Sequence, residues 1–201
     1  MHKVVAMLSL AVMFAAGAAQ AAGDAAAGKT KAATCAACHG ADGNSANPEW
    51  PKLAGQHQDY LLKQLKEFKS GERQNALMAG QVAALNEQDM ADLAAYFASL
   101  EGSIGEADPA QVELGQSLYR AGNSRSGVAA CAACHSPTGA GNPQAKFPRL
   151  SGQHATYTAI QLKAFRSGGR ANDAGQMMRN IAAKMTDAEI AAVAQYVQGL
   201  H

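Results

Sequence analysis

Two short stretches of the chain place two cysteines and a histidine at one fixed spacing. Residues 33–40 read ATCAACHG and residues 129–136 read AACAACHS, so the pattern C-x-x-C-H recurs after 96 residues. The chain has no other cysteines than those of the two patterns, Cys35, Cys38, Cys131 and Cys134. The histidines that follow them are His39 and His135. Thiols and an imidazole at this spacing can form a disulfide, a redox-active pair, a zinc site or a covalent attachment for haem.

Four interpretations therefore compete, and the rest of the chain favours haem. A disulfide framework is open to an exported protein. A thioredoxin-like pair sits in a strand-rich fold, and paired zinc knuckles space their cysteine pairs by about 15–20 residues rather than by a whole domain. In c-type attachment both thiols add to the vinyl groups of the porphyrin, and the adjacent histidine binds the iron. One helical turn brings both sulfurs to one edge of the porphyrin, and two copies without a spare cysteine fit two haem groups.

The sixth ligand of each iron decides whether the protein carries electrons or binds small molecules. Only Met78 and Met178 are methionine in both halves at one register, and they follow the proximal histidines by 39 and 43 residues. A methionine usually packs in a core, and we expect this of Met90 and Met185, whose counterparts are aliphatic. The counterpart of Met177 is a leucine, which argues against ligation. We therefore expect Met78 and Met178 to bind iron.

Two further histidines, His57 and His154, are also counterparts of each other. Each follows its proximal histidine by only about 18 residues and stands at the start of a predicted helix. We expect them to begin helices or to lie on the surface.

Histidine and methionine on one iron favour the ferrous state and raise the reduction potential. An iron closed on both faces by protein ligands mostly transfers electrons, so the protein's task is positioning, burial and docking. No paired carboxylates, activated nucleophile or phosphate-binding loop stand out. We expect an electron carrier and not an enzyme.

A long internal repeat carries these residues. Residues 50–53, WPKL, correspond to residues 147–150, FPRL, and GQH at residues 55–57 recurs at residues 152–154. The repeat predicts two similar domains, 22–104 with the first haem and 105–201 with the second, which follow a signal peptide expected at 1–21. The joint falls in EGSIGEADPA, residues 101–110, where glycines and a proline break helices.

The elements that must position the ligands are helices, and the predicted fold class is all-α. Leu61, Leu65 and Phe68 share one face of a helix over residues 60–70. A second helix opens at Asn86 and its counterpart at Thr186, where the sequence TDAE is a capping-box pattern. Their predicted inner stripes are Met90, Leu93, Ala94 and Phe97, and Ile190, Val193, Ala194 and Val197. No run shows the alternation of a strand.

The first residues predict export. A basic start precedes the uncharged apolar run 4–19, and residues 19–21 read AQA, a cleavage pattern of secretory signals. The alternative, a retained membrane anchor, is disfavoured because a spanning helix needs about 20 apolar residues. We expect cleavage after Ala21 and a periplasmic location.

Composition and charge complete the expectation. Aromatic residues make up only 5% of the chain, so two flat apolar macrocycles would supply core that halves of this size lack. Residues 22–108 hold seven Lys and Arg against twelve Asp and Glu, a net charge of −5, whereas residues 109–201 hold nine against four, a net charge of +5. Such asymmetry concerns docking partners rather than the fold.

Over its whole predicted mature length the chain resembles the cytochrome c4 family of dihaem periplasmic cytochromes. The resemblance rests on both CAACH blocks, on AGDAAAG at residues 22–28, on FPRLSGQHATYTAIQL at residues 147–162 and on QYVQGLH at residues 195–201. It implies two tandem cytochrome c-like domains, each wrapped around one covalently bound haem and related by an approximate twofold axis. The haem propionates would face each other near the interface. It also implies His39 and Met78 on one iron, and His135 and Met178 on the other.

The resemblance further implies electron transfer toward terminal oxidases and a loose association with the inner membrane. The leading hypothesis is a monomeric carrier between a quinol–cytochrome c reductase and a haem-copper oxidase, with no nucleic-acid partner. The alternatives are a haem subunit of a flavoprotein dehydrogenase and a dihaem peroxidase, the latter needing an iron that can open one face.

Overall fold

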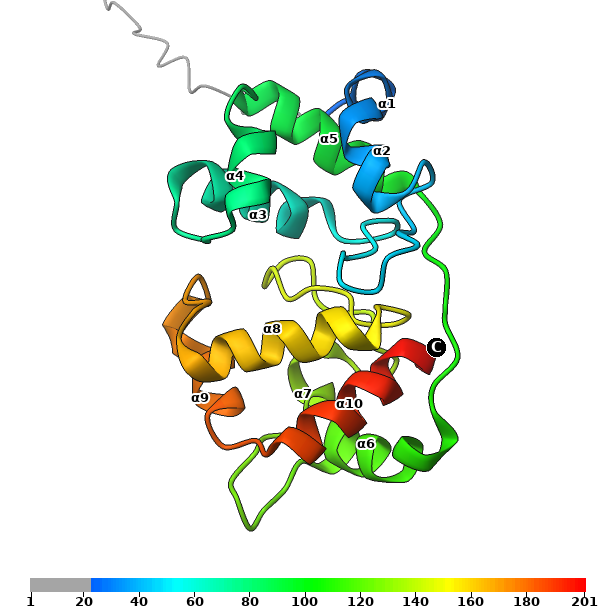
Figure 1. The fold of residues 1–201 in the computed structure, drawn as a ribbon, viewed down its shortest axis with the longest axis vertical. Helices are drawn as coiled ribbons and strands as arrows, with labels where there is room; N and C mark the ends of the chain where they lie inside the picture. Colours follow the sequence, from blue (N-terminus) through cyan, green and yellow to red (C-terminus); the bar gives the residue numbers. More distant parts are fainter. Residues whose placement is uncertain (1–22) are drawn as a thin grey trace, which may run out of the picture.

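The computed structural model describes residues 23–201 and folds them into two helical lobes. The predicted signal peptide, residues 1–21, lies outside the described residues. Figure 1 shows the lobes stacked along the long axis of the molecule, with α1–α5 in the N-terminal lobe and α6–α10 in the C-terminal lobe. Within residues 23–201, β pairing is limited to two isolated bridges. The all-α prediction is confirmed for this part of the chain.

Each lobe is a set of short helices around its own core. The N-terminal lobe contains α1 (Ala25–Lys31), α2 (Ala33–His39), α3 (Gln58–Ser70), α4 (Ala76–Val82) and α5 (Glu87–Ser99). The C-terminal lobe contains α6 (Pro109–Ala121), α7 (Ala132–His135), α8 (Ala155–Ser167), the 3-10 turn η1 (Ala174–Gln176), α9 (Met177–Ala182) and α10 (Asp187–Gly199).

Side-chain caps fix where the last long helix of each lobe begins. The Asn86 side chain accepts from the backbone N–H of Asp89, and the Asp89 carboxylate accepts from the backbone N–H of Asn86. Thr186 and Glu189 form the same reciprocal capping box at the start of α10. Each box satisfies two backbone donors that a helix start leaves free, and both predicted helix starts are confirmed.

The predicted inner stripes of α5 and α10 form the centres of the two cores. All eight stripe residues are buried: Met90, Leu93, Ala94, Phe97, Ile190, Val193, Ala194 and Val197. In the N-terminal lobe the apolar cluster is small, with Leu61 and Ala32 joining three residues of the stripe. The C-terminal cluster is larger because Tyr119, Leu118 and Val128 add bulk to the stripe of α10.

Glycines let the first helix of each lobe cross its last helix at close range. A Cβ atom placed on Gly28 in α1 would lie 2.1 Å from the carbonyl oxygen of Asp92 in α5. A Cβ atom on Gly115 in α6 would lie 2.3 Å from the carbonyl oxygen of Ala192 in α10. Only a residue without a side chain fits at either crossing. The two lobes therefore pack their first and last helices in the same way.

An extended segment, residues 100–108, joins the lobes and runs down one side of the molecule (Figure 1). The backbone N–H of Ser103 donates to Asn44 of the N-terminal lobe over 2.8 Å. Two residues further on, the N–H of Gly105 donates to the backbone oxygen of Gln198 over 3.1 Å. Residues before 104 thus bond to the N-terminal lobe, and residues after it bond to the C-terminal lobe. The domain boundary between residues 104 and 105 stays a prediction.

Candidate functional site

Both C-x-x-C-H patterns lie on helical turns. Cys35, Cys38 and His39 all belong to α2, which ends at Gly40 with a φ of 83°. In the second copy Cys131 is the N-cap of α7, whose last residue is His135. One helical turn therefore separates the cysteines of each pair, and the histidine comes directly after it, as the sequence predicts.

None of the four cysteines is paired in a disulfide in the structure. The second cysteine of each pair is exposed, whereas Cys35 and Cys131 are half-buried and pack against the cores of their lobes. Burial raises the pKa of the Cys35 thiol and raises that of Cys131 to about 11. A redox-active pair works through a thiolate, which a raised pKa disfavours, so the surroundings of Cys35 and Cys131 do not favour the thioredoxin-like interpretation.

His39 and His135 are held in the same way. Each ring is buried, and its Nδ1 lies 2.9 Å from the Pro51 oxygen for His39 and 3.0 Å from the Pro148 oxygen for His135. A carbonyl oxygen can only accept, so Nδ1 carries the proton and Nε2 keeps its lone pair. Burial lowers the pKa of both histidines against the opposing effect of the proline carbonyls. The neutral tautomer with Nε2 free is the form that binds a metal.

The methionines differ in burial. Met90 and Met185 are buried in the two cores, which confirms them as packing residues. Met177 is 40% exposed at the start of α9. Met78 in α4 and Met178 in α9 are half-buried on helices that pack against α3 and α8, respectively.

This donor set fits haem c. Each lobe offers two thiols one turn apart, a neutral imidazole with a free Nε2 and, on another helix, a thioether sulfur, which are the groups that attach and ligate a c-type haem. In the described part of the chain no three His, Cys, Asp or Glu side chains gather where they could hold a metal ion. The zinc interpretation thus has no ligand cluster there. The ligand roles of His39, Met78, His135 and Met178 stay predictions.

His57 and His154 begin α3 and α8 as their N-caps, as the sequence predicts. Each also bonds the opposite lobe. The Nε2 of His57 lies 2.7 Å from the carbonyl oxygen of Ala140, and the Nε2 of His154 lies 2.8 Å from that of Ser45. Both acceptors lie in loops that follow a C-x-x-C-H pattern, so these histidines connect each helix start to the neighbouring candidate haem site.

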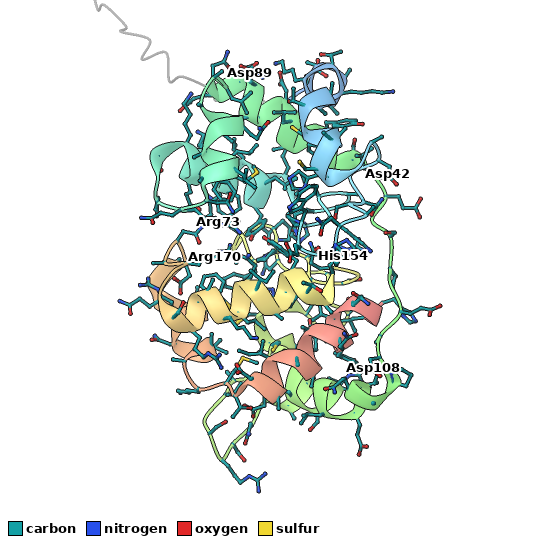
Figure 2. All side chains as sticks on the ribbon, in the orientation of Figure 1. Asp42, Arg73, Asp89, Asp108, His154 and Arg170 are labelled. Carbon is teal, nitrogen blue, oxygen red and sulfur yellow. The ribbon has the colours of Figure 1, made fainter. Side chains whose placement is uncertain are left out.

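A buried polar group between α3 and α8, which we call the arginine cluster, was not predicted. It consists of Tyr60, Gln64, Arg73, Tyr157, Gln161 and Arg170. The Arg73 guanidinium donates to Tyr157 over 3.0 Å and to Gln161 over 2.8 Å, and both acceptors lie in the other lobe. Arg170 donates to Tyr60 over 3.0 Å and to Gln64 over 3.1 Å in the reverse direction. Figure 2 shows the two arginines facing each other from opposite lobes.

The arginine cluster buries two positive charges without a carboxylate on either guanidinium. Arg73 is 8% exposed and Arg170 is 9% exposed, and neither forms a salt bridge within residues 23–201. Each guanidinium also lies over a phenylalanine ring of its own lobe, 4.6 Å from the Phe68 centroid for Arg73 and 4.4 Å from the Phe165 centroid for Arg170. The twofold repetition of these contacts ties the two candidate sites into one unit.

No helix among residues 23–201 has the length and apolar character required to cross a membrane.

Comparison with known proteins supports two sites of one kind. A family model described as cytochrome c matches residues 25–101 and residues 112–201. The chain is 54% identical over 195 residues to cytochrome c4 of Azotobacter vinelandii, covering 92% of this chain and 93% of the relative. It is 38% identical over 203 residues to the thiosulfate dehydrogenase electron acceptor of Thiomonas intermedia, covering 98% of this chain and 90% of the relative.

A solved structure gives the same result for the fold. The chain is similar to reduced recombinant cytochrome c4 from Pseudomonas stutzeri with a TM-score of 0.87 and 50% sequence identity. The match covers 90% of this chain and all of the other. Each segment matched by the family model contains one C-x-x-C-H pattern. Two cytochrome c domains with these cysteine pairs fit two covalently bound haem c groups.

Proposed function

The chain belongs to the cytochrome c4 family of dihaem electron carriers, and we propose that it carries electrons in the periplasm from a quinol–cytochrome c reductase to a terminal haem-copper oxidase. The observation that carries the proposal is that one chain contains two cytochrome c segments whose net charges are opposite. The net charge is −5 over residues 22–108 and +5 over residues 109–201. Two redox sites in one chain accept two electrons. Opposite charges orient the chain against a charged partner.

Each haem c supplies a one-electron iron couple when it is bound, and the residues of the chain hold it. Cys35 and Cys38 attach the first haem, and Cys131 and Cys134 attach the second. His39 and Met78 bind the first iron, and His135 and Met178 bind the second. The free Nε2 of each buried histidine supports this assignment, because the proline carbonyl has fixed the tautomer that donates to iron.

Cleavage of the signal peptide after Ala21 releases a monomer into the periplasm. The monomer associates peripherally with the inner membrane. N-terminal sequencing of the purified protein tests this step. A mature chain that begins at Ala22 is the expected result, whereas retention of residues 1–21 would contradict it.

Reconstitution tests the proposed partners. The protein is mixed with quinol–cytochrome c reductase, haem-copper oxidase and quinol, and oxygen uptake is followed as ionic strength rises. We expect uptake that depends on the protein and that falls with added salt, because salt screens charges over about 8–10 Å at 0.10–0.15 M. No uptake above the level without the protein would contradict the proposal.

A second candidate function is the acceptance of electrons from a thiosulfate dehydrogenase. It is favoured by the relative of that name, which is 38% identical over 203 residues. The same assay separates the candidates when thiosulfate and its dehydrogenase replace quinol and the reductase. Reduction at least tenfold faster than by the quinol route would favour this candidate over the first.

A further inference from the structure

Two glutamines form matching hydrogen-bonded contacts between the lobes, which we call the glutamine clamps. The side-chain amide of Gln153 accepts from the backbone N–H of Lys52 over 3.0 Å and donates to the Lys52 oxygen over 3.0 Å. The side-chain amide of Gln56 accepts from the backbone N–H of Arg149 over 2.8 Å and donates to the Arg149 oxygen over 2.9 Å. Each clamp thus uses both backbone groups of one residue in the opposite lobe.

The clamped N–H groups belong to the peptide units that hold the proximal histidines. The unit between Pro51 and Lys52 offers its oxygen to Nδ1 of His39 and its N–H to Gln153. The unit between Pro148 and Arg149 offers its oxygen to Nδ1 of His135 and its N–H to Gln56. A continuous hydrogen-bonded chain therefore runs from each histidine ring through one planar peptide group to a glutamine of the other lobe.

Hydrogen bonds in such a chain polarise one another. An amide whose N–H is already donating carries more negative charge on its oxygen, because the two groups share one resonance system. A stronger acceptor on Nδ1 gives the imidazole more anionic character and makes Nε2 a better donor to a metal. A better donor favours ferric over ferrous iron, so each clamp lowers the reduction potential of the iron that its histidine binds.

We infer that Gln153 tunes the iron bound by His39 and that Gln56 tunes the iron bound by His135, each acting across the lobe interface as a positioning residue. The inference rests on the proposed ligation by the two histidines. Each redox site then depends on a side chain of the domain that houses the other site. The lobes must stay docked for either haem to keep its potential.

The burial of the clamps supports a specific role. Gln56 is buried and Gln153 is half-buried. The Oε1 atom of each also accepts from the backbone N–H of the next residue, over 3.0 Å at His57 and 3.1 Å at His154. The oxygen and the nitrogen of each side-chain amide are therefore both hydrogen-bonded, which holds the amide in the orientation of the clamp.

Substitution by methionine tests the inference, because methionine keeps the length of glutamine but can neither accept nor donate as an amide does. In Gln153→Met the potential of the His39 haem is expected to rise, with a shift at least twice that of the His135 haem. Gln56→Met is expected to give the reverse pattern. A redox titration resolved by haem, with NMR resonances assigned through the Met78 and Met178 ligands, measures both shifts.

Gln64→Met is the matched control. Gln64 is a buried glutamine of the same interface that belongs to the arginine cluster and contacts neither of the two clamped peptide units. It is expected to shift both haems by similar amounts. Equal shifts at both haems in the two clamp variants, or a larger shift at the haem of the mutated lobe, would overturn the inference.

Hydrogen exchange on the unmodified protein gives a test that needs no variant to fold. The N–H groups of Lys52 and Arg149 are expected to exchange at least tenfold more slowly than the N–H of Glu101, an exposed residue. Exchange of the Lys52 and Arg149 amides as fast as that of Glu101 would refute the clamps. A wild-type spectrum without histidine-ligated haem would instead refute the proposed function, so the two failures are distinguishable.

Discussion

A single hydrogen bond from Nδ1 to a proline carbonyl holds the rings of His39 and His135. It fixes the tautomer, orients the ring and leaves the lone pair of Nε2 free in both lobes. The proposed second ligand of each iron lies on a different helix, α4 for Met78 and α9 for Met178. The account at this scale therefore depends on which methionines bind.

Replacement of each proposed methionine ligand is expected to remove one of two equal sites. In Met78→Ala and in Met178→Ala, the far-red charge-transfer band of methionine-bound ferric haem should fall to about half, since each iron contributes one sulfur bond. The potential of the affected haem should also fall, because a thioether favours ferrous iron. Absorption spectra and a redox titration measure both effects.

The core methionines are the matched controls for that experiment. Met90→Leu and Met185→Leu replace buried methionines by a side chain of similar volume, which costs less than about 1.5 kcal/mol of stability. The far-red band should keep its full intensity in both. A loss of the band in either control, with full intensity in Met78→Ala, would contradict the assignment.

The helical turn of each C-x-x-C-H pattern and the core packing of Met90 and Met185 could be predicted from the sequence, because spacing and repetition mark them. The roles of Arg73, Arg170, Gln56 and Gln153 could not. These side chains form hydrogen bonds to the other lobe, and a periodic pattern within one helix does not say which second surface it contacts. Their recurrence in both halves was the available signal, since polar residues repeated at one register on a helix face indicate a shared contact.

At the scale of helices, the crossing of the first and last helix holds each lobe together. Gly28→Ala is expected to destabilise the N-terminal lobe, because the new Cβ would lie 2.1 Å from the Asp92 oxygen. Overpacking of this kind typically costs about 1–3 kcal/mol. Chemical denaturation followed by circular dichroism measures the change.

Gly80→Ala in α4 controls for the substitution itself. Nothing lies within 4 Å of a Cβ atom placed there, and alanine inside a helix is favoured over glycine by roughly 0.5–1 kcal/mol. A stability equal to or above the wild type is expected. If Gly28→Ala caused no loss of stability, the distance between α1 and α5 would have to be larger than in the structure.

The contact of α1 with α5 also makes the N-terminal lobe sensitive to acid. Asp92 accepts from Lys31 over 2.6 Å, from the Asp24 N–H over 2.9 Å and from Gln88 over 2.7 Å. These bonds, that of Lys31 first, lower the pKa of the Asp92 carboxyl from 3.8 to about 2. A carboxyl whose pKa falls on folding stabilises the protein above its unfolded pKa and loses that contribution as the pH falls toward the folded value.

Asp92→Asn should therefore be less stable than the wild type at neutral pH, and the difference should shrink as the pH falls from about 4 to 2. Denaturation curves taken across this range measure it. The corresponding residue of the C-terminal lobe is Ala192, so no such term is expected there. A difference that stays constant down to pH 2 would contradict the role of the charge.

Helix positions and inner stripes could be predicted because capping boxes and 3.6-residue periodicity are local properties. The chain between α8 and α9 was harder. Three inserted residues after Asn172 are accommodated by a 3-10 turn in which Gly175 and Gln176 both have a φ of 58°. The crossing glycines were also missed, since a glycine inside a helix has no signature that reveals what packs against it.

On the scale of the whole molecule, the two cores are small and the interface between them is polar. The cluster of the N-terminal lobe contains five buried residues, of which two are alanines. Cys35 and Cys131 lie at the edges of these clusters. A haem attached through these cysteines would therefore extend the core of each domain.

Protein that lacks haem is therefore expected to be largely unfolded. The variant to make replaces all four cysteines by serine, and circular dichroism and thermal melting measure its helix content and cooperativity. We expect a large loss of helix and no cooperative transition, because domains under 100 residues often need a metal or another cross-link. A cooperative, native-like melt would contradict this role of the haem.

The most direct test of the account is the amount and attachment of haem in the purified protein. Pyridine haemochrome spectra and metal analysis give the number of haems and irons per chain. The intact mass under denaturing conditions shows whether the haem is covalently attached. Two irons per chain, in haem that stays attached after denaturation, is the result that the account predicts. Colourless protein, zinc in place of iron, or haem released by denaturation would contradict it.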